Sequence, residues 1–315
     1  MKKEKDLISV LMPTYNVEKY VEEAVRSIVD QTWKNFELII VDDCSTDKTF
    51  AILQKLAKED LRIKLYRNEV NLKICKTLNR AWSYATGNYI ARMDGDDVST
   101  PDRFQVLMNF LYTHKKCGLV GSGMITIDEN GKELAYSSLV HSNYYIKKVI
   151  KYRSPIAHIW IARREVYEKL KGYREIPYAE DADFIFRCVR NGFELANVRE
   201  YLYKCRIRNG NTSSTNGVIQ SKTFDYVYKL YLNECRQKND LFSERNLQEH
   251  IKSSSKENKS YFRCYYHLMN ALKNKRKPFL FTVNTIMALS NYWTRKYIFN
   301  SIAFRFYVLK EKNEY

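Results

Sequence analysis

Two features are missing from this 315-residue sequence: a paired cysteine motif and an apolar segment long enough to cross a membrane. The seven cysteines are spread along the chain without a C-x-x-C pair, so neither a disulfide framework nor a zinc site is predicted. The nearest approach to a spanning segment, residues 278–293, is broken by Asn284 and Asn291 and is shorter than the roughly 20 residues required. The first apolar run is too short for a signal peptide, and Asp6 interrupts it. We therefore expect a cytoplasmic protein, soluble or peripheral at a membrane.

The sequence also lacks the signatures of several common classes of binding protein. No G-x-G-x-x-G follows the first predicted strand, which argues against a dinucleotide enzyme. Lys and Arg number 53 against 36 Asp and Glu, and the formal net charge of +17 favours a polyanionic partner such as nucleic acid, an anionic membrane or a phosphorylated substrate. A zinc finger, an arginine-rich arm and an aromatic RNA-binding signature are absent, so no nucleic-acid partner is predicted. A non-enzymatic nucleic-acid-binding protein remains an alternative.

The first part of the chain contains alternating apolar strands and amphipathic helices. Strands are predicted over 7–13, 36–43, 62–67 and 88–93, and helices over 17–31, 49–58, 75–85 and 102–114. Asn16 is expected to cap the first helix, and Gly87 to end the third. This alternation predicts an α/β fold in which helices cover a mostly parallel sheet.

Strands and helices are also predicted in the remainder of the chain. Asn130-Gly131 is typical of a hairpin turn between two strands of the 118–138 segment. Helical spacing indicates a helix over 178–192 that stops at Gly192. Two short strands are predicted over 193–198 and 200–207. From about residue 217 the sequence is helical, basic and rich in aromatic residues, with almost no Gly or Pro.

Polar residues follow three of the predicted strands at the point where each strand ends. These residues are Pro13, Thr14, Tyr15 and Asn16, then Asp42 and Asp43, then Asp94, Asp96 and Asp97. In parallel sheets ligands bind beyond the carboxyl ends of the strands, so we expect these groups to meet at one edge. Crowded carboxylates repel one another, and a divalent cation such as Mg²⁺ or Mn²⁺ would remove that repulsion. The alternative is a solvated acidic loop that precedes a helix.

Four segments, taken in order, resemble a known family. "SVLMPTYN", "IIVDDCSTDKT", "GNYIARMDGDD" and "PYAEDADFIFR" are similar to the motifs of inverting family 2 glycosyltransferases of the bacterial capsule and O-antigen type, over roughly residues 6–210. The resemblance implies a glycosyltransferase-A fold, Rossmann-like, with a catalytic domain over 1–215 and a helical C-terminal region over 216–315. It also implies transfer of a hexose or N-acetylhexosamine from a nucleotide sugar, with UDP favoured, to a hydroxyl of a lipid-linked oligosaccharide.

The resemblance assigns roles to individual positions. On the donor side, Pro13 to Asn16 would flank the nucleotide, Asp43 with Asp42 would hydrogen-bond the base, Lys76 and Asn79 would lie beside the diphosphate and sugar, Asp94 would contact the sugar, and Arg206 would approach the phosphates. Mn²⁺ or Mg²⁺ would be held by Asp96 as the direct ligand, with Asp97 as the alternate and Asp94 beside them.

On the acceptor side the resemblance supplies a general base. Inversion is a single displacement, so the attacking hydroxyl must lose a proton, and Asp181 of the Glu180-Asp181 pair would accept it. The same pair could instead be the acidic start of a helix. His158 matches a segment near the acceptor, although a lone histidine is more often structural.

This chain departs from the family pattern at three positions. Lys73 stands where the family usually has Gly, Ile159 where it has Pro, and Arg208 where it has His. The first change puts the loop beside the diphosphate in doubt. The last removes a histidine, although an arginine binds phosphate as well or better.

Two questions stay open on the sequence alone. "DGDDV" after a strand also fits the nucleophile motif of haloacid-dehalogenase phosphatases, although that motif ends the first core strand of those enzymes and here it ends the fourth. In the tail, Lys273, Lys275, Arg276 and Lys277 precede an apolar stripe with Trp293, Tyr297 and Phe299. Basic and aromatic residues in this arrangement predict binding to an anionic membrane surface, at the inner face of the plasma membrane. The alternative is that these helices pack on the catalytic domain or form a dimer contact.

Overall fold

The structure is a computed structural model that describes residues 6–208, 217–273 and 277–314. The chain forms two compact units. The first comprises residues 1–148, 154–175 and 180–208, and the second comprises residues 149–153, 176–179 and 209–315. The boundary that the sequence predicts after residue 215 lies outside the described residues, so that boundary stays a prediction.

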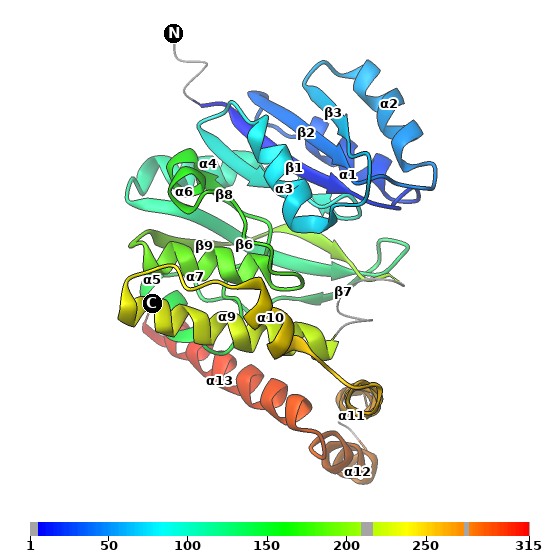
Figure 1. Ribbon diagram of the computed structural model, residues 1–315, viewed down its shortest axis with the longest axis vertical. Helices are drawn as coiled ribbons and strands as arrows, with labels where there is room; N and C mark the ends of the chain where they lie inside the picture. The colour runs from blue at the N-terminus through cyan, green and yellow to red at the C-terminus, as the bar shows by residue number, and fades with distance from the viewer. Residues whose placement is uncertain (1–5, 209–216, 274–276, 315) are drawn as a thin grey trace. The chain divides into compact units, whose positions relative to one another are not determined.

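The first unit is built on a sheet whose strands run in the order β3-β2-β1-β4-β8-β6-β9-β5, with β7 paired to β6. The first four strands in this order are parallel to one another, and a helix follows each of β1, β2 and β3 along the chain (Figure 1). These elements are β1 (Ile8–Thr14), α1 (Val21–Val29), β2 (Phe36–Asp42), α2 (Thr49–Glu59), β3 (Ile63–Arg67), α3 (Lys73–Ser83) and β4 (Tyr89–Arg92). All residues of β1 and β2 are buried, as expected for apolar runs inside a covered parallel sheet.

The second half of this sheet is mixed. The β4–β8, β6–β8, β5–β9 and β6–β7 pairs are antiparallel, while β6 and β9 are parallel. The elements of this half are β5 (Val98–Ser99), α4 (Arg103–Thr113), β6 (Cys117–Ile127), β7 (Glu133–Tyr136), α5 (Asn143–Val149), β8 (Ile161–Arg163), α6 (Arg164–Leu170), α7 (Glu180–Arg190) and β9 (Glu194–Arg206). The predicted α/β class is therefore confirmed. The sheet is mixed, with parallel pairing among β3, β2, β1 and β4 and again between β6 and β9.

Helix spacing explains which faces of the helices are buried. In α1 the residues Val21, Ala24, Val25 and Ile28 are fully buried and belong to the same core cluster as residues of β1, β2 and α4. A stripe at spacings of three and four residues covers one face of a helix, which is the face that packs on the sheet.

Three local predictions were wrong. The two strands expected over 193–198 and 200–207 are a single strand, β9, because it pairs along its length with β6 and tolerates shifts of register. Asn16 does not cap α1; its φ is 50°, its side-chain oxygen accepts a hydrogen bond from Thr46 N at 2.9 Å, and the helix begins at Val21. Gly87 does not end α3, which ends at Ser83. A Cβ at Gly87 would collide with the carbonyl of Leu7, so the glycine permits close approach to the chain before β1.

The second unit is helical, as the sequence predicts. Its helices are α9 (Gly217–Gln237), α10 (Glu244–Ile251), α11 (Ser255–Lys273), α12 (Pro278–Ala288) and α13 (Tyr292–Glu314). Asp225 of α9 joins three of them, because its carboxylate lies 3.3 Å from His250 Nε2 of α10 and forms an ion pair with Lys296 of α13. Within the described part of the chain, no helix combines the length and the apolar character needed to cross a bilayer.

Candidate active site

The three polar strand ends meet at the same edge of the sheet. Thr14 lies in register with Asp42, and Asp43 N donates a hydrogen bond to Thr14 O at 2.8 Å. The turn after β4 approaches this pair so closely that a Cβ at Gly95 would lie 2.8 Å from Cγ2 of Thr14. The glycine of the "DGDD" motif thus lets the acidic turn lie against the end of β1.

Asp42 holds the turn between β2 and α2. Its carboxylate is fully buried and accepts hydrogen bonds from Ser45 N at 3.0 Å and Ser45 Oγ at 2.5 Å. Arg67 at the end of β3 lies 3.3 Å from its second oxygen. In this structure Asp42 therefore stabilises the turn at this edge of the sheet. Recognition of the nucleotide base by Asp42 stays a prediction.

Asp43 organises the loop that enters α3. Its carboxylate accepts hydrogen bonds from Asn68 Nδ2 at 2.7 Å, Leu72 N at 2.7 Å and Lys73 N at 2.9 Å. Lys73 has φ of 69°, so it adopts the left-handed conformation that the glycine usually found here would take more easily. That conformation costs a non-glycine residue about 1 kcal/mol, and the hydrogen bond to Asp43 holds it in place.

Lys76 and Asn79 fix a loop of the sheet unit to α3. Asn79 donates from Nδ2 to Tyr173 O at 2.8 Å and accepts from Tyr173 N at 2.8 Å. Lys76 forms an exposed ion pair with Glu175 at 3.1 Å. The Asn79 amide is thus occupied by backbone groups, and the contacts of both residues with the diphosphate and sugar stay a prediction.

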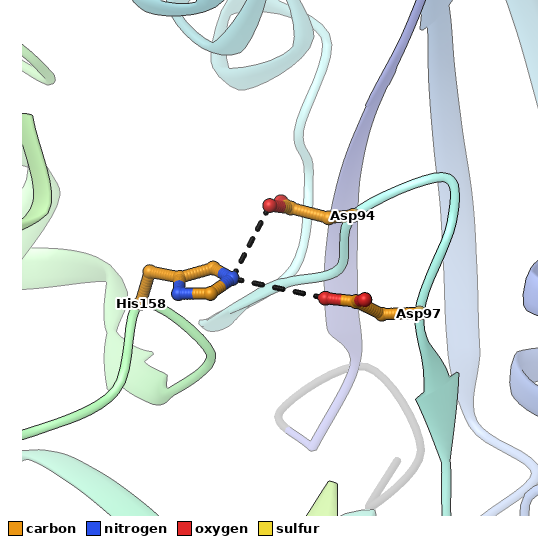
Figure 2. A group of neighbouring side chains, drawn as sticks. All are labelled: Asp94, Asp97 and His158. Atoms are coloured by element: carbon orange, nitrogen blue, oxygen red, sulfur yellow. Dashed lines mark ion pairs between the residues drawn. The ribbon is translucent and has the colours of Figure 1, made fainter. Parts of the chain in front are cut away.

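The acidic turn itself is held by a network of donors. Asp94 pairs with Arg92, Nε to Oδ1 at 3.0 Å, and with His158, whose Nε2 lies 3.2 Å from Oδ2 (Figure 2). Asp97 accepts hydrogen bonds from Tyr203 Oη and from Arg206 N, the latter at 2.7 Å. His158 Nε2 lies 3.9 Å from Asp97 Oδ2, so the imidazole faces both carboxylates.

Ion pairing and burial set the pKa values of this cluster. Although burial opposes ionisation, Arg92 and His158 hold the pKa of Asp94 well below its usual range. Burial would lower the pKa of His158, but the Asp94 carboxylate outweighs it and raises that pKa to about 10. The positive charges of Arg92 and His158 therefore offset the repulsion among the crowded carboxylates without a bound metal ion.

Asp96 faces a different partner. Its Oδ2 accepts a hydrogen bond from Arg208 Nε at 2.7 Å. Burial and repulsion from Asp97 raise the pKa of Asp96 to about 6, although Arg208 opposes that shift. The departure from the family's histidine at position 208 therefore places a guanidinium on the residue that the sequence assigns as the direct metal ligand.

Arg206 is occupied by the protein. It is buried, and its guanidinium donates to Asp96 O at 2.9 Å, to the carbonyls of Asp128 and Glu129, and to Glu23 Oε2 at 2.6 Å. These bonds tie the end of β9 to the acidic turn and to α1. The approach of Arg206 to phosphates stays a prediction, and Arg208 is the more exposed of the two side chains.

Asp94, Asp97 and His158 form the group whose geometry suits a cation. One ligand atom from each lies within 4.8 Å of the others. Mg²⁺ and Mn²⁺ prefer carboxylate oxygens as ligands, and transition-metal ions also accept an imidazole nitrogen. The donor set fits a divalent cation once His158 gives up its proton, because only the neutral imidazole has a lone pair for a metal. His158 then stands in place of the predicted Asp96 among the residues that converge. Direct ligation by Asp96 stays a prediction.

Glu180 and Asp181 begin α7. Glu180 is 8% exposed and forms an ion pair through Oε1 with Arg92 Nη1 at 3.0 Å. Burial raises the pKa of Glu180, with Arg92 opposing that shift and Asp181 adding to it. Asp181 is more exposed, and its Oδ1 accepts a hydrogen bond from Ala182 N at 2.8 Å. Of the two acids, Asp181 is the one not engaged by a buried guanidinium.

Sequence reasoning missed Arg92 and Tyr203, which both bind the acidic turn. Arg92 was counted within an apolar run, but a lone arginine in a buried strand requires an anionic partner. Its partner Asp94 lies two positions on, the spacing that puts side chains on one face of an extended chain. That spacing was the available signal. Tyr203 offered none, because it reaches Asp97 across 106 residues.

Comparisons with known proteins agree with this architecture. The model of the family described as glycosyl transferase family 2 matches residues 9–171. The O-antigen biosynthesis glycosyltransferase WbnJ of Escherichia coli is 30% identical over 279 residues, which cover 85% of this chain and 97% of WbnJ.

Solved structures match the fold. S. aureus TarS 1–349 in complex with UDP-GlcNAc superposes with a TM-score of 0.60 and 24% identity, covering 78% of this chain and 70% of TarS. The mannosyltransferase PcManGT from Pyrobaculum calidifontis in complex with GDP-Man and Mn²⁺ gives a TM-score of 0.57 at 14% identity, covering 98% of this chain and 86% of PcManGT. At these sequence identities the two matches support the glycosyltransferase-A fold and nothing more specific.

The alternatives of a haloacid-dehalogenase-like phosphatase and of a nucleic-acid-binding protein find no support in these comparisons. A family model that covers more than half of the chain, together with a glycosyltransferase aligned over nearly its whole length, decides the assignment. The chain is a glycosyltransferase and belongs to glycosyl transferase family 2.

Proposed function

We propose that this enzyme transfers a hexose or N-acetylhexosamine, with inversion, from a UDP-sugar to a sugar hydroxyl of a lipid-linked oligosaccharide in bacterial surface polysaccharide synthesis. The observation that carries the proposal is the Asp94, Asp97 and His158 group at the strand ends, linked through Arg92 to the start of α7. The naming of WbnJ as an O-antigen enzyme and the UDP-GlcNAc complex of TarS support the acceptor class and the donor.

In this proposal the chain's own residues divide the work. Asp94, Asp97 and His158 would hold a divalent cation, Mn²⁺ or Mg²⁺, and the cation would neutralise the diphosphate of the departing nucleotide. The Mn²⁺ complex of PcManGT supports manganese as the first ion to test. Tyr15, which is 45% exposed beside the end of β1, presents an aromatic face for the base, and Asp43 keeps the neighbouring loop in shape.

Asp181 would act as the base. The acceptor hydroxyl attacks the anomeric carbon and loses its proton to the Asp181 carboxylate, while the nucleoside diphosphate leaves from the opposite side. Glu180 would not compete for this role, because its carboxylate is buried against Arg92.

A panel of nucleotide sugars with Mn²⁺, scored for release of nucleoside diphosphate, tests the proposal directly. We expect release from one or a few UDP-sugars, and faster release when a membrane lipid fraction supplies an acceptor. The matched control is the same panel with GDP- and dTDP-sugars. Release from none of them, or hydrolysis of simple phosphate esters instead, would contradict the proposal.

We further infer that the second unit binds the anionic inner face of the plasma membrane. Many large apolar side chains of α12, α13 and the turn between them are exposed: Phe279, Leu280, Phe281, Val283, Ile286, Met287, Leu289, Tyr292, Tyr297, Phe299, Ile302, Phe306 and Leu309. Arg295, Arg305, Lys310 and Lys312 are exposed on α13. An apolar surface of this extent, with basic residues on the same helix, suits an anionic bilayer.

Part of the basic cluster expected before α12 lies outside the described residues. Lys275 and Arg276 lie outside the described residues, as does the side chain of Lys273, while Lys277 is exposed. The basic residues of α13 therefore carry the charge argument.

Co-sedimentation with liposomes measures this association. We expect the full chain to sediment with vesicles that contain anionic lipid at low salt, and to be released at high salt because the basic contribution is screened. Phe281→Glu with Ile286→Glu should leave the protein in the supernatant. The matched control is Leu61→Glu with Val70→Glu, two exposed apolar residues of the first unit. Equal recovery of all three proteins in the supernatant would exclude the membrane role, and a change of oligomeric state in the first variant would identify the surface as a dimer contact.

A further inference from the structure

Arg92 is a buried cation that contacts two separate parts of the candidate site. The residue is 2% exposed and ends β4. One edge of its guanidinium binds Asp94, with Nε 3.0 Å from Oδ1 and Nη2 3.4 Å from Oδ2, and Nη1 lies 3.0 Å from Oε1 of Glu180. A guanidinium presents its donors in a fixed planar fork, so it sets the relative positions of the two carboxylates that it binds.

The backbone of Arg92 is fixed before its side chain begins. Its carbonyl accepts a hydrogen bond from the fully buried Arg103 Nη2 at 2.9 Å, and its amide donates to Trp160 O at 3.3 Å. It also lies in register with Leu11 of β1. The guanidinium is therefore anchored to the centre of the sheet by a side chain with little freedom.

A continuous series of charged contacts runs through this guanidinium. His158 faces Asp97 and Asp94, Asp94 binds Arg92, and Arg92 binds Glu180, the neighbour of Asp181. The cation-binding end of the site and the proposed base are joined by this one residue. An arginine that only neutralised Asp94 would not need to reach α7.

We propose that Arg92 is a positioning residue that fixes the distance between the donor side of the site, at Asp94, and the base Asp181, by holding Glu180 at the start of α7. The inference rests on the proposed function of Asp181. A general base works only within hydrogen-bond reach of its proton, and a misplacement of about 1 Å costs on the order of a hundredfold in rate. The donor and the acceptor are each still bound when the base is misplaced, so turnover falls more than substrate affinity.

The test compares Arg92→Lys, Arg92→Gln and Glu180→Gln with the double variant that carries the last two changes. Lysine keeps the positive charge, but its ammonium group is a compact point charge that cannot bind Asp94 and Glu180 together as the planar guanidinium does. We expect kcat to fall about 10- to 100-fold in Arg92→Lys, while KM for the nucleotide sugar stays within about threefold. We expect the two glutamine changes to be non-additive, since each breaks the same contact.

A matched control separates positioning from loss of stability. Arg187 is also buried and paired, with Nε 2.7 Å from Asp183 Oδ2, but it binds no carboxylate of the candidate site. Arg187→Lys should lower the melting temperature without the split between kcat and KM. The inference is overturned if Arg92→Lys behaves like Arg187→Lys, or if the Arg92→Gln and Glu180→Gln losses simply add.

Hydrogen exchange provides a measurement that does not depend on activity. Arg92→Gln should increase exchange of the backbone amides in the first two turns of α7, and Arg92→Lys should do so in part. Unchanged exchange there would overturn the positioning role even if no donor were found. A wild-type enzyme that releases no nucleoside diphosphate from any nucleotide sugar would instead defeat the proposed function, and the exchange result would still stand.

Discussion

Asp181→Asn is expected to lower turnover by on the order of a hundredfold or more, the usual contribution of a positioned base. Asparagine keeps the size of the side chain and removes the proton acceptor. Asp181 is the acid at the start of α7 that no buried guanidinium engages, and its Oδ1 hydrogen bond to Ala182 N can be kept by the amide oxygen. Binding of UDP is expected to change little, which can be measured by titration calorimetry alongside kcat.

Asp102→Asn is the matched control for this substitution. Asp102 is likewise an acid at the start of a helix, is exposed, and accepts a hydrogen bond from Thr100 Oγ1 at 2.8 Å, but it belongs to no part of the candidate site. Its variant should retain wild-type turnover. An Asp181→Asn enzyme within a few-fold of wild type would move the base to Glu180 or His158.

Removal of the divalent cation is expected to abolish sugar transfer. Excess EDTA is expected to stop release of nucleoside diphosphate, and Mn²⁺ or Mg²⁺ to restore it, because the charge on the leaving diphosphate is otherwise uncompensated. Asp97→Asn should weaken Mn²⁺ binding at least about tenfold, since a carboxylate ligand becomes a neutral amide. Electron paramagnetic resonance of free Mn²⁺ measures that affinity without any turnover.

The same titration decides between the two candidate ligand sets. Asp96→Ala tests the assignment made from the sequence motif, and His158→Ala tests the group that converges in the structure. Loss of Mn²⁺ binding in Asp96→Ala would establish ligation by Asp96 and require its pair with Arg208 to open. Asp60→Asn, at a surface pair with Arg62, is the control. Full activity in excess EDTA would refute the metal requirement.

Much of the fold was predictable because its first half is locally encoded. Short runs that are mainly apolar, such as 7–13 and 36–43, are typical of strands that are covered on both faces. A helix such as α1 buries a single stripe of apolar residues. Once parallel strands are inferred, the shared edge of their polar ends follows. The meeting of Thr14, Asp42 and the acidic turn confirms that step.

What could not be predicted depends on partners far apart in the chain. The antiparallel strand β8 inserts beside β4, and β9 forms one long strand because β6 supports it, neither of which is marked by a local pattern. The sequence predicts that Asp42 and Asp43 contact the nucleotide base. In the structure, Asp42 accepts a hydrogen bond from Ser45, and Asp43 accepts hydrogen bonds from the backbone amides of Leu72 and Lys73. Hydrogen bonds from backbone amides to a carboxylate cannot be inferred from composition or from the spacing of apolar residues.

The long separation between the acidic turn and β9 also sets an order of events during synthesis. Asp97 receives hydrogen bonds from residues 106 and 109 positions later, Tyr203 and Arg206. A ribosome adding about 5–20 residues per second exposes the acids several seconds before those donors exist. The nascent chain therefore carries an incomplete acidic turn until the last strand of the sheet emerges, and the site matures only when synthesis of the sheet unit is complete.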